Sequence, residues 1–248
     1  MSKKPIGVLL IHGWTASPKH VERIAPPLEA MGLSCVLPTL SGHGADSPEA
    51  LRHITWHDWL KDAKTALFQQ AEQSEKVIVV GHSLGGMLAL NLAADHPEII
   101  DSIVVAAATP LVSSPFGPSR PYNFLVPLIT LLYKNWNLSP DYAEKSLEQF
   151  HTAYPWTPTT SIATLFDCFK ETRRRLPQVT VPILIMQSRK DTTNSPEGVQ
   201  ILLDNIKTPQ DQKRVVWFEK TNHEMFLDCE WQATVACVAD FVKERIRD

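Results

Sequence analysis

The sequence predicts an α/β domain in which a mostly parallel sheet is flanked by helices. Its 248 residues suit one large domain of this class, and 44% of them are apolar, the usual balance of a globular protein. Six short apolar segments alternate along the chain with longer segments of helical periodicity. The apolar segments lack polar alternation, which indicates strands that helices cover on both faces.

The predicted strands consist of continuous runs of valine, isoleucine and leucine, such as GVLLI, VIVV and ILIM. Parallel strands joined by helices bring their carboxyl ends to one edge of the sheet, so the loops that follow them lie close together. The strands are predicted at Gly7–Ile11, 34–37, 77–80, 102–106, 183–186 and 215–218.

Three helices are predicted from apolar residues that recur at helical spacing. The first begins after Thr55, which suits the cap position, and includes residues 56–67. The second covers residues 83–94. The last runs from about residue 230 to 247 and carries its apolar residues on one face.

Residues 17–31 form a less regular helical stretch. Ser17 suits the cap position and Pro18 suits the first turn. The proline pair at 26–27 must break or restart the helix, because an internal proline removes a hydrogen bond and clashes with the preceding turn. Gly32 is expected to end it.

The alternation of strands and helices stops over residues 109–177. This stretch is rich in aromatic residues and proline and is too apolar for a linker. We interpret it as a mainly helical insertion between the fourth and fifth predicted strands, covering one end of the sheet. The chain is therefore expected to be a single domain, residues 1–248, with a cap insertion at about 109–177.

Charge and cysteine content argue against several classes of protein. Lys and Arg number 24 against 27 Asp and Glu, a net charge of -3, so there is no basic surplus to indicate a nucleic-acid partner. The four cysteines form no CxxC pair and match no zinc site or disulfide framework. We therefore expect reduced thiols in a cytoplasmic protein.

No targeting or spanning segment is predicted. The basic residues 1–4 precede an apolar run at 5–11 that is short for a secretory signal, and no suitable cleavage site follows promptly. The longest other apolar run, residues 125–133, is too short to cross a bilayer. The expected protein is a monomer or homodimer without an integral membrane segment.

The strongest local signal is GHSLGG at residues 81–86, which follows a predicted strand directly and opens a helix. A tight corner between strand and helix pushes a serine hydroxyl out above the sheet. Glycines suit this corner because a Cβ would clash with the crowded backbone. Ser83 is therefore a candidate nucleophile, and an ordinary tight turn is the alternative interpretation.

A serine hydroxyl needs a base, and His223 is the strongest candidate among nine histidines. It follows the last predicted strand and precedes the final helix, so its loop faces the same edge of the sheet as Ser83. A helix-capping role is the alternative. His12 and His43 lie in neighbouring loops, and His82 should point away from its neighbour Ser83.

The base needs an acid that fixes its tautomer and stabilises its charged form. Asp191 follows the fifth predicted strand closely and is the candidate. When a serine lies at such a strand-to-helix corner, the acid and then the histidine follow it along the chain, and Ser83, Asp191 and His223 have this order. A solvated turn aspartate is the alternative, and Asp211 and Asp228 are weaker candidates because neither closely follows a strand.

A tetrahedral intermediate needs preorganised N–H donors for its oxyanion. The candidates are the N–H of Leu84, directly after the nucleophile, and the N–H of Trp14, in the loop after the first strand. Gly13 allows that loop to approach closely. The chain has no GxGxxG, GxxxxGK[ST] or HExxH motif, so we expect no cofactor and no metal.

These residues resemble the α/β-hydrolase family over essentially the whole chain, and most closely its small bacterial carboxylesterases and monoacylglycerol lipases. The resemblance lies in LLIHGWTASP, SGHG, GHSLGG, ILIMQSRKD and TNH, in this order along the chain. It implies the α/β-hydrolase fold and an acyl pocket formed by the cap insertion. By position, Ser83, Asp191 and His223 match the family's nucleophile, acid and base. Trp14 and Leu84 match its oxyanion donors.

Two of these segments depart from the family's pattern. HGW stands where another esterase branch has HGGG, and Asp191 is followed by Thr192 where many relatives have an apolar residue shortly after the acid. The second departure concerns the packing of the loop that carries the acid.

Together these features predict a serine carboxylesterase that acts on a small-molecule ester with a medium or long acyl chain, such as a monoacylglycerol. His223 must be neutral to act as the base, so activity is expected to fall below about pH 6.5. Two alternatives stay open. One is a thioesterase or carbon–carbon bond hydrolase on the same scaffold, and the other is a binding protein without catalysis.

Overall fold

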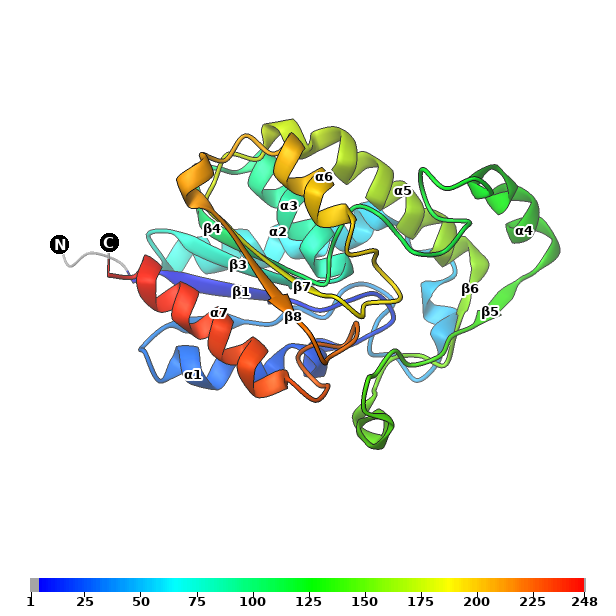
Figure 1. Cartoon of the computed structure of the whole chain (residues 1–248), viewed down its shortest axis with the longest axis horizontal. Coiled ribbons are helices and arrows are strands. Elements are labelled where there is room, and N and C mark those ends of the chain that lie inside the picture. Colours follow the sequence, from blue (N-terminus) through cyan, green and yellow to red (C-terminus); the bar gives the residue numbers. More distant parts are fainter. Residues whose placement is uncertain (1–4, 248) are drawn as a thin grey trace.

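Six parallel strands form the central sheet of the computed structural model, which describes residues 5–247 (Figure 1). The strands lie in the order β2-β1-β3-β4-β7-β8, and each neighbouring pair is parallel, which confirms the predicted class. The basic residues 1–4 lie outside the described residues. The strands are β1 Gly7–Ile11, β2 Ser34–Val36, β3 Val77–His82, β4 Ile100–Ala106, β7 Ile183–Ser188 and β8 Lys213–Phe218.

β4 and β8 each begin two residues before the predicted run, and two other strands extend past their runs at the carboxyl end. β3 continues to His82 and β7 continues to Ser188. Polar side chains are accommodated at these ends because they find hydrogen-bond partners in the loops above the sheet, as Gln187 does with Asp191. The extended ends therefore reach the edge of the sheet where the candidate site residues lie.

Helices cover both faces of the sheet (Figure 1). One face packs against α2, α3, α5 and α6, and the other packs against α1 and α7. In β1, Leu9 and Ile11 enter the first of these cores, whereas Val8 and Leu10 enter the second. The helices are α1 Ala25–Glu29, α2 Trp56–Gln73, α3 Leu84–Asp95, α5 Thr159–Arg175, α6 Gly198–Asn205 and α7 Trp231–Arg245.

Residues 17–31 contain two 3₁₀ turns, η1 Pro18–His20 and η2 Glu22–Ile24, followed by α1. The proline pair at 26–27 falls in the first turn of α1, where a missing N–H breaks no helical hydrogen bond, so it restarts the helix. Gly32 follows the end of α1 with a φ of 83°. Ser17 was expected to cap this stretch, but its hydroxyl makes no capping hydrogen bond.

The helix α6 was not predicted from the sequence. Its 8 residues make up about two turns, which is too short to display a clear helical periodicity. The helix packs Val199 and Leu202 against the first core. The predicted final helix is present as α7 and is shorter than predicted, beginning at Trp231 and ending at Arg245.

The last part of the stretch 109–177 is α5, which packs on α3 and places Cys168 and Phe169 in the first core. The preceding residues 109–158, here called the cap segment, extend past the carboxyl ends of the strands (Figure 1). They contain α4 Val126–Leu132 and an antiparallel pair of strands, β5 Asn135–Asn137 and β6 Trp156–Pro158.

The sequence predicted no strand in this stretch, because three-residue strands are too short to show a pattern. Residue patterns also leave the 3₁₀ turns unpredicted. These turns are η1 Pro18–His20, η2 Glu22–Ile24, η3 Pro48–Leu51, η4 Asn123–Leu125, η5 Lys145–Phe150, η6 Leu176–Gln178 and η7 Gln210–Gln212.

Within residues 5–247, no helix has both the length and the apolar character needed to cross a bilayer. The four cysteines are free thiols, one of them buried and three partly buried. These residues are Cys35, Cys168, Cys229 and Cys237.

Candidate active site

Ser83 stands at the sharp corner between β3 and α3, with φ 52° and ψ -117°. Such a backbone conformation is strained for a residue with a side chain, and the corner is held by close contacts. A Cβ at Gly81 would lie 2.2 Å from the carbonyl oxygen of Gly85, and one at Gly85 would lie 2.2 Å from the carbonyl oxygen of Ile11. The two glycines are therefore required for the corner that presents Ser83.

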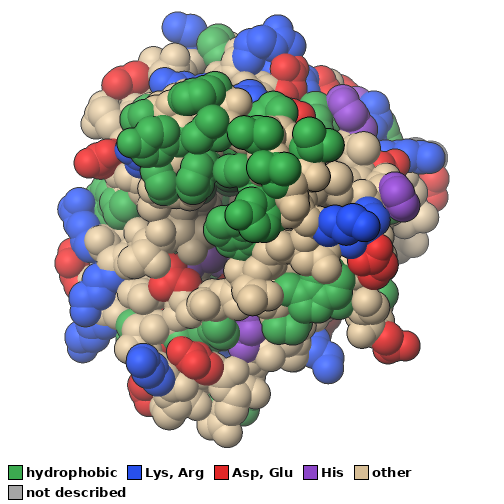
Figure 2. Space-filling view, turned by 90° about the vertical axis from the view of Figure 1, so that its right-hand side faces the viewer, with side chains coloured by type: hydrophobic (Ala, Val, Ile, Leu, Met, Phe, Trp, Pro, Cys, Tyr) green, Lys and Arg blue, Asp and Glu red, His purple; other side chains and the backbone are tan. Residues whose placement is uncertain are grey.

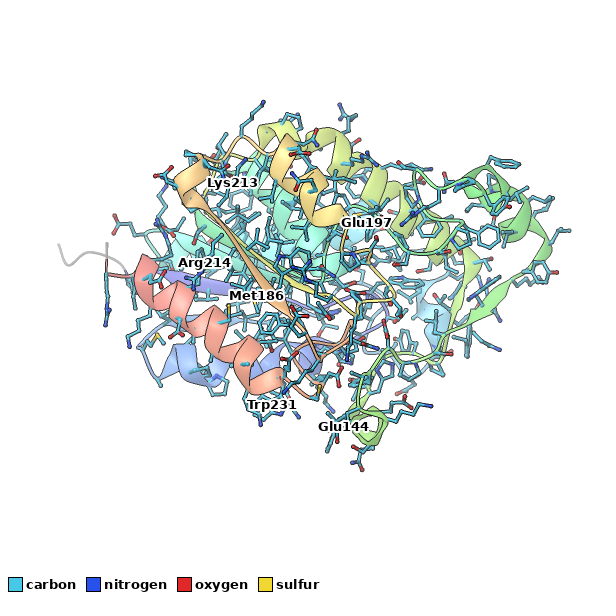
Figure 3. All side chains as sticks on the ribbon, in the orientation of Figure 1. Glu144, Met186, Glu197, Lys213, Arg214 and Trp231 are labelled. Carbon is cyan, nitrogen blue, oxygen red and sulfur yellow. The ribbon has the colours of Figure 1, made fainter. Side chains whose placement is uncertain are left out.

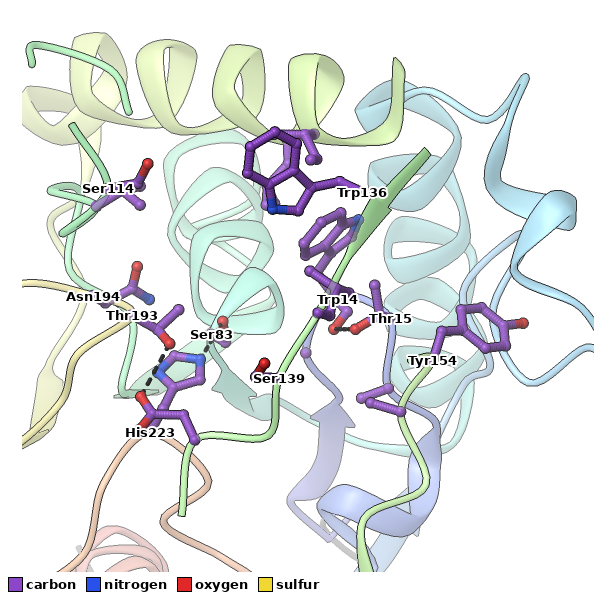
Figure 4. A pocket seen from close by; sticks show the side chains of 18 of the residues that line it. Trp14, Thr15, Ser83, Ser114, Trp136, Ser139, Tyr154, Thr193, Asn194 and His223 are labelled. Atoms are coloured by element: carbon purple, nitrogen blue, oxygen red, sulfur yellow. Dashed lines mark hydrogen bonds between the residues drawn. The ribbon is translucent and has the colours of Figure 1, made fainter. Parts of the chain in front are cut away.

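The structure brings the three predicted residues of the nucleophile, base and acid into one hydrogen-bonded row. The hydroxyl of Ser83 donates to Nε2 of His223, with 3.0 Å between Oγ and Nε2 (Figure 4). The Nδ1 of His223 donates to the carboxylate of Asp191, at 3.0 Å from Oδ2 and 3.1 Å from Oδ1. These contacts select the imidazole tautomer that leaves Nε2 free to accept a proton from the serine.

The Asp191 carboxylate is buried and fully hydrogen-bonded. Its Oδ1 accepts from the N–H groups of Thr193 at 2.9 Å and Asn194 at 2.8 Å, and its Oδ2 accepts from Nε2 of Gln187 at 2.9 Å. These donors satisfy the acceptor capacity of the buried carboxylate and hold it in one orientation. Thr192, the residue after Asp191, is exposed and makes no hydrogen bond to this carboxylate.

Electrostatics favour a charged imidazole at His223. Burial alone would lower its pKa, but the carboxylates of Asp191, Glu224 and Asp141 outweigh this effect and raise the pKa to about 9. The sequence-based expectation rested on the ordinary imidazole value and placed the loss of activity below about pH 6.5. From the structure we expect this loss at a higher pH, because a base with a raised pKa becomes protonated at a higher pH.

Three other histidines near the site, His12, His43 and His82, are buried, and their rings bond to the backbone. His82 donates from Nε2 to the carbonyl oxygen of His223 at 2.9 Å, and burial lowers its pKa to about 4. His12 donates from Nδ1 to the carbonyl oxygen of Gly13 and accepts from the N–H of Leu40, so its ring is neutral. Burial lowers the pKa of His12 to about 3 and that of His43 to about 4.

The two weaker candidates for the acid lie outside the hydrogen-bonded row. Asp211 is exposed in η7, which precedes β8 and lies at the opposite end of the sheet from Ser83. Asp228 is buried, but its carboxylate accepts from backbone N–H groups, including that of Asn222 at 2.8 Å, and not from His223.

Of the two candidate oxyanion donors, Trp14 lies in the loop after β1, and Leu84 is the first residue of α3, directly after Ser83. Gly13 lies against the serine corner, since a Cβ there would be 3.3 Å from Cβ of Ser83. The Trp14 indole donates from Nε1 to the hydroxyl of Ser161 in α5 at 2.9 Å, which anchors the loop. Among the described residues, neither the N–H of Trp14 nor that of Leu84 has a protein acceptor, so both can donate to an oxyanion.

A pocket of about 270 Å³ opens above Ser83 between the sheet and the cap segment (Figure 4). His223 lies on one side of it, and Trp14 and Trp136 lie on the other. Polar groups gather near His223, whereas the remainder of the lining is mostly apolar. The apolar lining includes Val112, Phe116, Val126, Ile129, Trp136, Leu165, Phe166 and Phe169.

One side of the helix α4 lines this pocket and the other side faces solvent. Val126 and Ile129 line the pocket, whereas Leu131 and Leu132 on the same helix are 79% and 65% exposed. Exposed apolar side chains of α4 and its neighbours gather into a patch on the outer face of the cap segment (Figure 2). The patch comprises Tyr122, Phe124, Leu128, Leu131, Leu132, Tyr133 and Trp136.

Sequence reasoning missed several residues around the site. Gln187 and Asp141 touch the acid loop, Ser161 anchors Trp14, and Glu224 accepts from Nδ1 of His20 at 3.0 Å. Of these residues, only Glu224 could have been found from the sequence, because it directly follows the predicted base. Within residues 5–247, no group of His, Cys, Asp and Glu side chains is arranged to hold a metal ion.

Comparison with known proteins agrees with this architecture. A family model described as serine aminopeptidase, S33, matches residues 3–230, and the chain belongs to this family of α/β-hydrolases. A thermostable monoacylglycerol lipase from Bacillus sp. (strain H-257) is 29% identical over 226 residues, which cover 90% of this chain and 85% of the lipase. A carboxylesterase from Bacillus subtilis (strain 168) is 27% identical over 238 residues, covering 96% and 92%.

A solved structure from a study of LipS and LipT, two metagenome-derived lipolytic enzymes, has the same fold. It superposes with a TM-score of 0.87 at 26% identity and covers 98% of this chain and 96% of its own. The fold and the family together define a serine hydrolase of the esterase and lipase type.

Proposed function

We propose that the chain is a serine carboxylesterase that hydrolyses esters of medium to long acyl chains, with monoacylglycerol-like compounds as the substrate class. The observation that carries this proposal is the hydrogen-bonded row Ser83–His223–Asp191 at the base of a mostly apolar pocket. The names of the bacterial relatives, a monoacylglycerol lipase and a carboxylesterase, support the same reaction class.

In the first step, Oγ of Ser83 attacks the ester carbonyl while Nε2 of His223 takes its proton. Asp191 stabilises the imidazolium that forms, because its carboxylate accepts from Nδ1. The carbonyl oxygen becomes an oxyanion, and the N–H groups of Trp14 and Leu84 donate to it. This stabilisation acts mainly on the transition state, because charge develops on the oxygen only there.

The tetrahedral intermediate then collapses. His223 gives its proton to the leaving alcohol, the bond between carbon and that oxygen breaks, and the acyl group remains on Ser83. Water attacks the acyl-enzyme with His223 again as the base, and the second collapse releases the carboxylic acid and restores the serine. Because His223 serves both as base and as acid, the alcohol leaves on its side of the pocket.

The pocket supports an acyl chain longer than that of acetate. Apolar side chains from the cap segment and from α5 surround the space away from His223, including Ile129, Trp136 and Phe166. Each methylene that such a lining takes out of water contributes about 0.8 kcal/mol. We propose that residues 109–158 act as a cap and supply the acyl-binding wall, while polar groups near His223 face the alcohol.

Hydrolysis of p-nitrophenyl esters of two to sixteen carbons by the wild type and by Ser83→Ala tests the reaction class. We expect turnover by the wild type, loss of that turnover in Ser83→Ala, and a preference for chains of about eight carbons or more, as burial of the additional methylenes favours. Hydrolysis of monoacylglycerols of the preferred chain length then tests the substrate class.

Two results would contradict the proposal. Turnover of acyl-thioesters or carbon–carbon substrates without turnover of any oxygen ester would assign a different reaction to the same residues. Absence of all turnover, together with absence of labelling by a fluorophosphonate, would exclude a serine hydrolase.

A further inference from the structure

A single carboxylate of the cap segment contacts both loops that carry the candidate acid and base. Oδ2 of Asp141 accepts from the hydroxyls of Thr192 at 2.8 Å and Thr193 at 3.1 Å. Oδ1 of Asp141 accepts from Nδ2 of Asn222 at 2.9 Å. The donors lie one and two residues after Asp191 on one loop and directly before His223 on the other, and these loops follow different strands.

Asp141 is itself held in place by a second carboxylate, that of Asp228. Oδ2 of Asp228 accepts from the N–H of Ala143 at 2.8 Å, and Oδ1 accepts from the N–H of Glu144 at 3.2 Å. The same Oδ2 accepts from the N–H of Asn222 at 2.8 Å. Asp228 is fully buried, so these hydrogen bonds are protected from water.

The two carboxylates therefore join the cap segment to the loops of Asp191 and His223, and each side supplies one of the accepting carboxylates. Asp141 of the cap segment accepts from the loops that carry Asp191 and His223, whereas Asp228, between β8 and α7, accepts from the cap segment. Asn222 joins both, because its side chain donates to Asp141 and its backbone N–H donates to Asp228. Since Asn222 directly precedes His223, its position constrains the backbone that carries the imidazole.

The constraint on Asn222 matters for the proposed reaction because the adjacent His223 makes two hydrogen bonds at once. His223 must keep Nε2 toward Ser83 and Nδ1 toward Asp191 at the same time, with each bond close to 3.0 Å. A shift of about 1 Å between reacting groups can lower a rate by about a hundredfold. A bridge that fixes the two loops relative to one another therefore serves catalysis without touching the reacting atoms.

We propose that Asp141 is a positioning residue that holds the loop of Asp191 and the loop of His223 in register, with Asp228 fixing the cap segment that carries it. This inference rests on the proposed function, because it assigns a role within the same hydrolysis. It also places part of the catalytic geometry under the control of the cap segment.

Asp141→Asn is the primary test, because Asp141 is only partly buried and the substitution keeps its size. An amide at 141 can accept from the two threonine hydroxyls, but its NH₂ group then faces the NH₂ group of Asn222, and the bridge breaks. The double variant Asp141→Asn/Asn222→Asp restores one donor and one acceptor across this pair. Thr192→Val removes a single donor from an exposed position.

Glu144→Gln is the matched control. It removes a carboxylate from the same part of the cap segment, and Figure 3 places Glu144 in the loop beside the start of α7. The Glu144 side chain is exposed and accepts from the hydroxyl of Ser146 at 2.7 Å, and the backbone N–H that donates to Asp228 is unchanged.

Three readouts apply to each variant: kcat and KM on a p-nitrophenyl ester, the rate of fluorophosphonate labelling, and the low-field proton resonance of Nδ1 of His223. For Asp141→Asn we expect kcat and the labelling rate to fall about tenfold, a fraction of the loss that full misplacement causes. KM should stay within about twofold, the low-field resonance should broaden or vanish, and the double variant should recover most of the loss. Thr192→Val should show a smaller loss, and Glu144→Gln should match the wild type.

The bridge would be refuted if Asp141→Asn kept the wild-type kcat, labelling rate and resonance. It would also be refuted if the double variant failed to recover any of the loss, because that variant restores both the carboxylate and the donor–acceptor pair across this contact. Labelling and the resonance need no ester substrate. A wild type that hydrolyses no ester but is labelled would therefore refute the proposed function while the bridge is still tested.

Discussion

The imidazole of His82, next to the candidate nucleophile, donates a hydrogen bond to the backbone carbonyl of His223, the candidate base, with 2.9 Å between Nε2 and the oxygen. His82 thereby contacts the loop that carries His223 from the end of β3, and Asp141 contacts the same loop from the cap segment. The burial that lowers the pKa of His82 to about 4 keeps its ring neutral over the range in which most enzymes work.

This contact predicts different outcomes for two substitutions of His82. His82→Leu leaves the buried carbonyl of His223 without a donor, so we expect a loss of about 1–3 kcal/mol of stability and a lower kcat. His82→Gln keeps an N–H donor and should retain most of both. Urea unfolding and ester turnover measure the two effects. Equal behaviour of the leucine and glutamine variants would show that the hydrogen bond contributes little.

Because the pKa of His223 is raised, activity should be lost on acidification at a higher pH than an ordinary imidazole would give. The base must be neutral, so kcat/KM should rise with pH and fall as the pH drops through the raised pKa, well above 6.5. A profile that is flat from pH 9 down to pH 6.5 would contradict this.

Glu224 provides a second test of the same electrostatics. Although burial alone would raise it, the neighbouring His20 holds the pKa of Glu224 well below its usual range, so Glu224 is a carboxylate near His223. Glu224→Gln removes one negative charge that raises the pKa of His223, and the acid limb of the profile should move to lower pH. Glu219→Gln, at an exposed carboxylate, is the control and should leave the limb in place. If the acid limb shifted in both variants, or in neither, Glu224 would not be a specific cause of the raised pKa of His223.

Much of the fold was predictable because buried parallel strands and sharp corners restrict sequence strongly. The run at 77–80 has apolar residues on both faces since helices cover both sides of the sheet, and Gly81 and Gly85 occur where a Cβ would overlap backbone atoms. Asp191 and His223 could be located because the loops after parallel strands share one edge. The helix α6 and the β5–β6 pair were not predictable, because each is too short to repeat a pattern.

The contacts around the candidate site were harder to predict than the residues in its centre. Asp141 meets Thr192, Thr193 and Asn222 across 51, 52 and 81 positions of sequence, respectively. These pairings depend on the path of the cap segment, which has no regular periodicity between α4 and β6. The pKa of His223 was unpredictable for the same reason, because Asp141 and Glu224 act on it through space.

The anchor of Trp14 predicts an effect of a buried residue that lies away from the reacting atoms. Ser161 accepts the indole N–H of Trp14 and is itself fully buried in α5. Ser161→Ala removes this hydrogen bond, worth about 0.5–1.5 kcal/mol, and should lower kcat by about two- to tenfold by loosening the loop of the oxyanion donor. Ser161→Thr, which keeps a hydroxyl, is the comparison. Steady-state kinetics with a soluble short-chain ester measure the effect, and unchanged kcat in Ser161→Ala would separate the anchor from the oxyanion donor.

The two faces of α4 predict that a substitution on the inner face changes chain-length selectivity and that the same substitution on the outer face does not. Ile129 lines the pocket, whereas Leu131, two residues further along the same helix, is 79% exposed. Ile129→Trp places a larger side chain in the acyl space and should exclude the outer methylenes of a long chain. Loss of two methylene contacts at about 0.8 kcal/mol each corresponds to about a tenfold fall in kcat/KM for a twelve-carbon ester, with little change for a four-carbon ester.

Leu131→Trp adds the same side chain outside the pocket and should leave the chain-length profile unchanged on esters below their micelle concentration. The measurement is kcat/KM over the series of p-nitrophenyl esters for both variants and the wild type. If Ile129→Trp kept the wild-type profile, the acyl chain would not run along α4. If Leu131→Trp shifted the profile as strongly as Ile129→Trp, the effect would arise from altered packing of the helix rather than from its inner face.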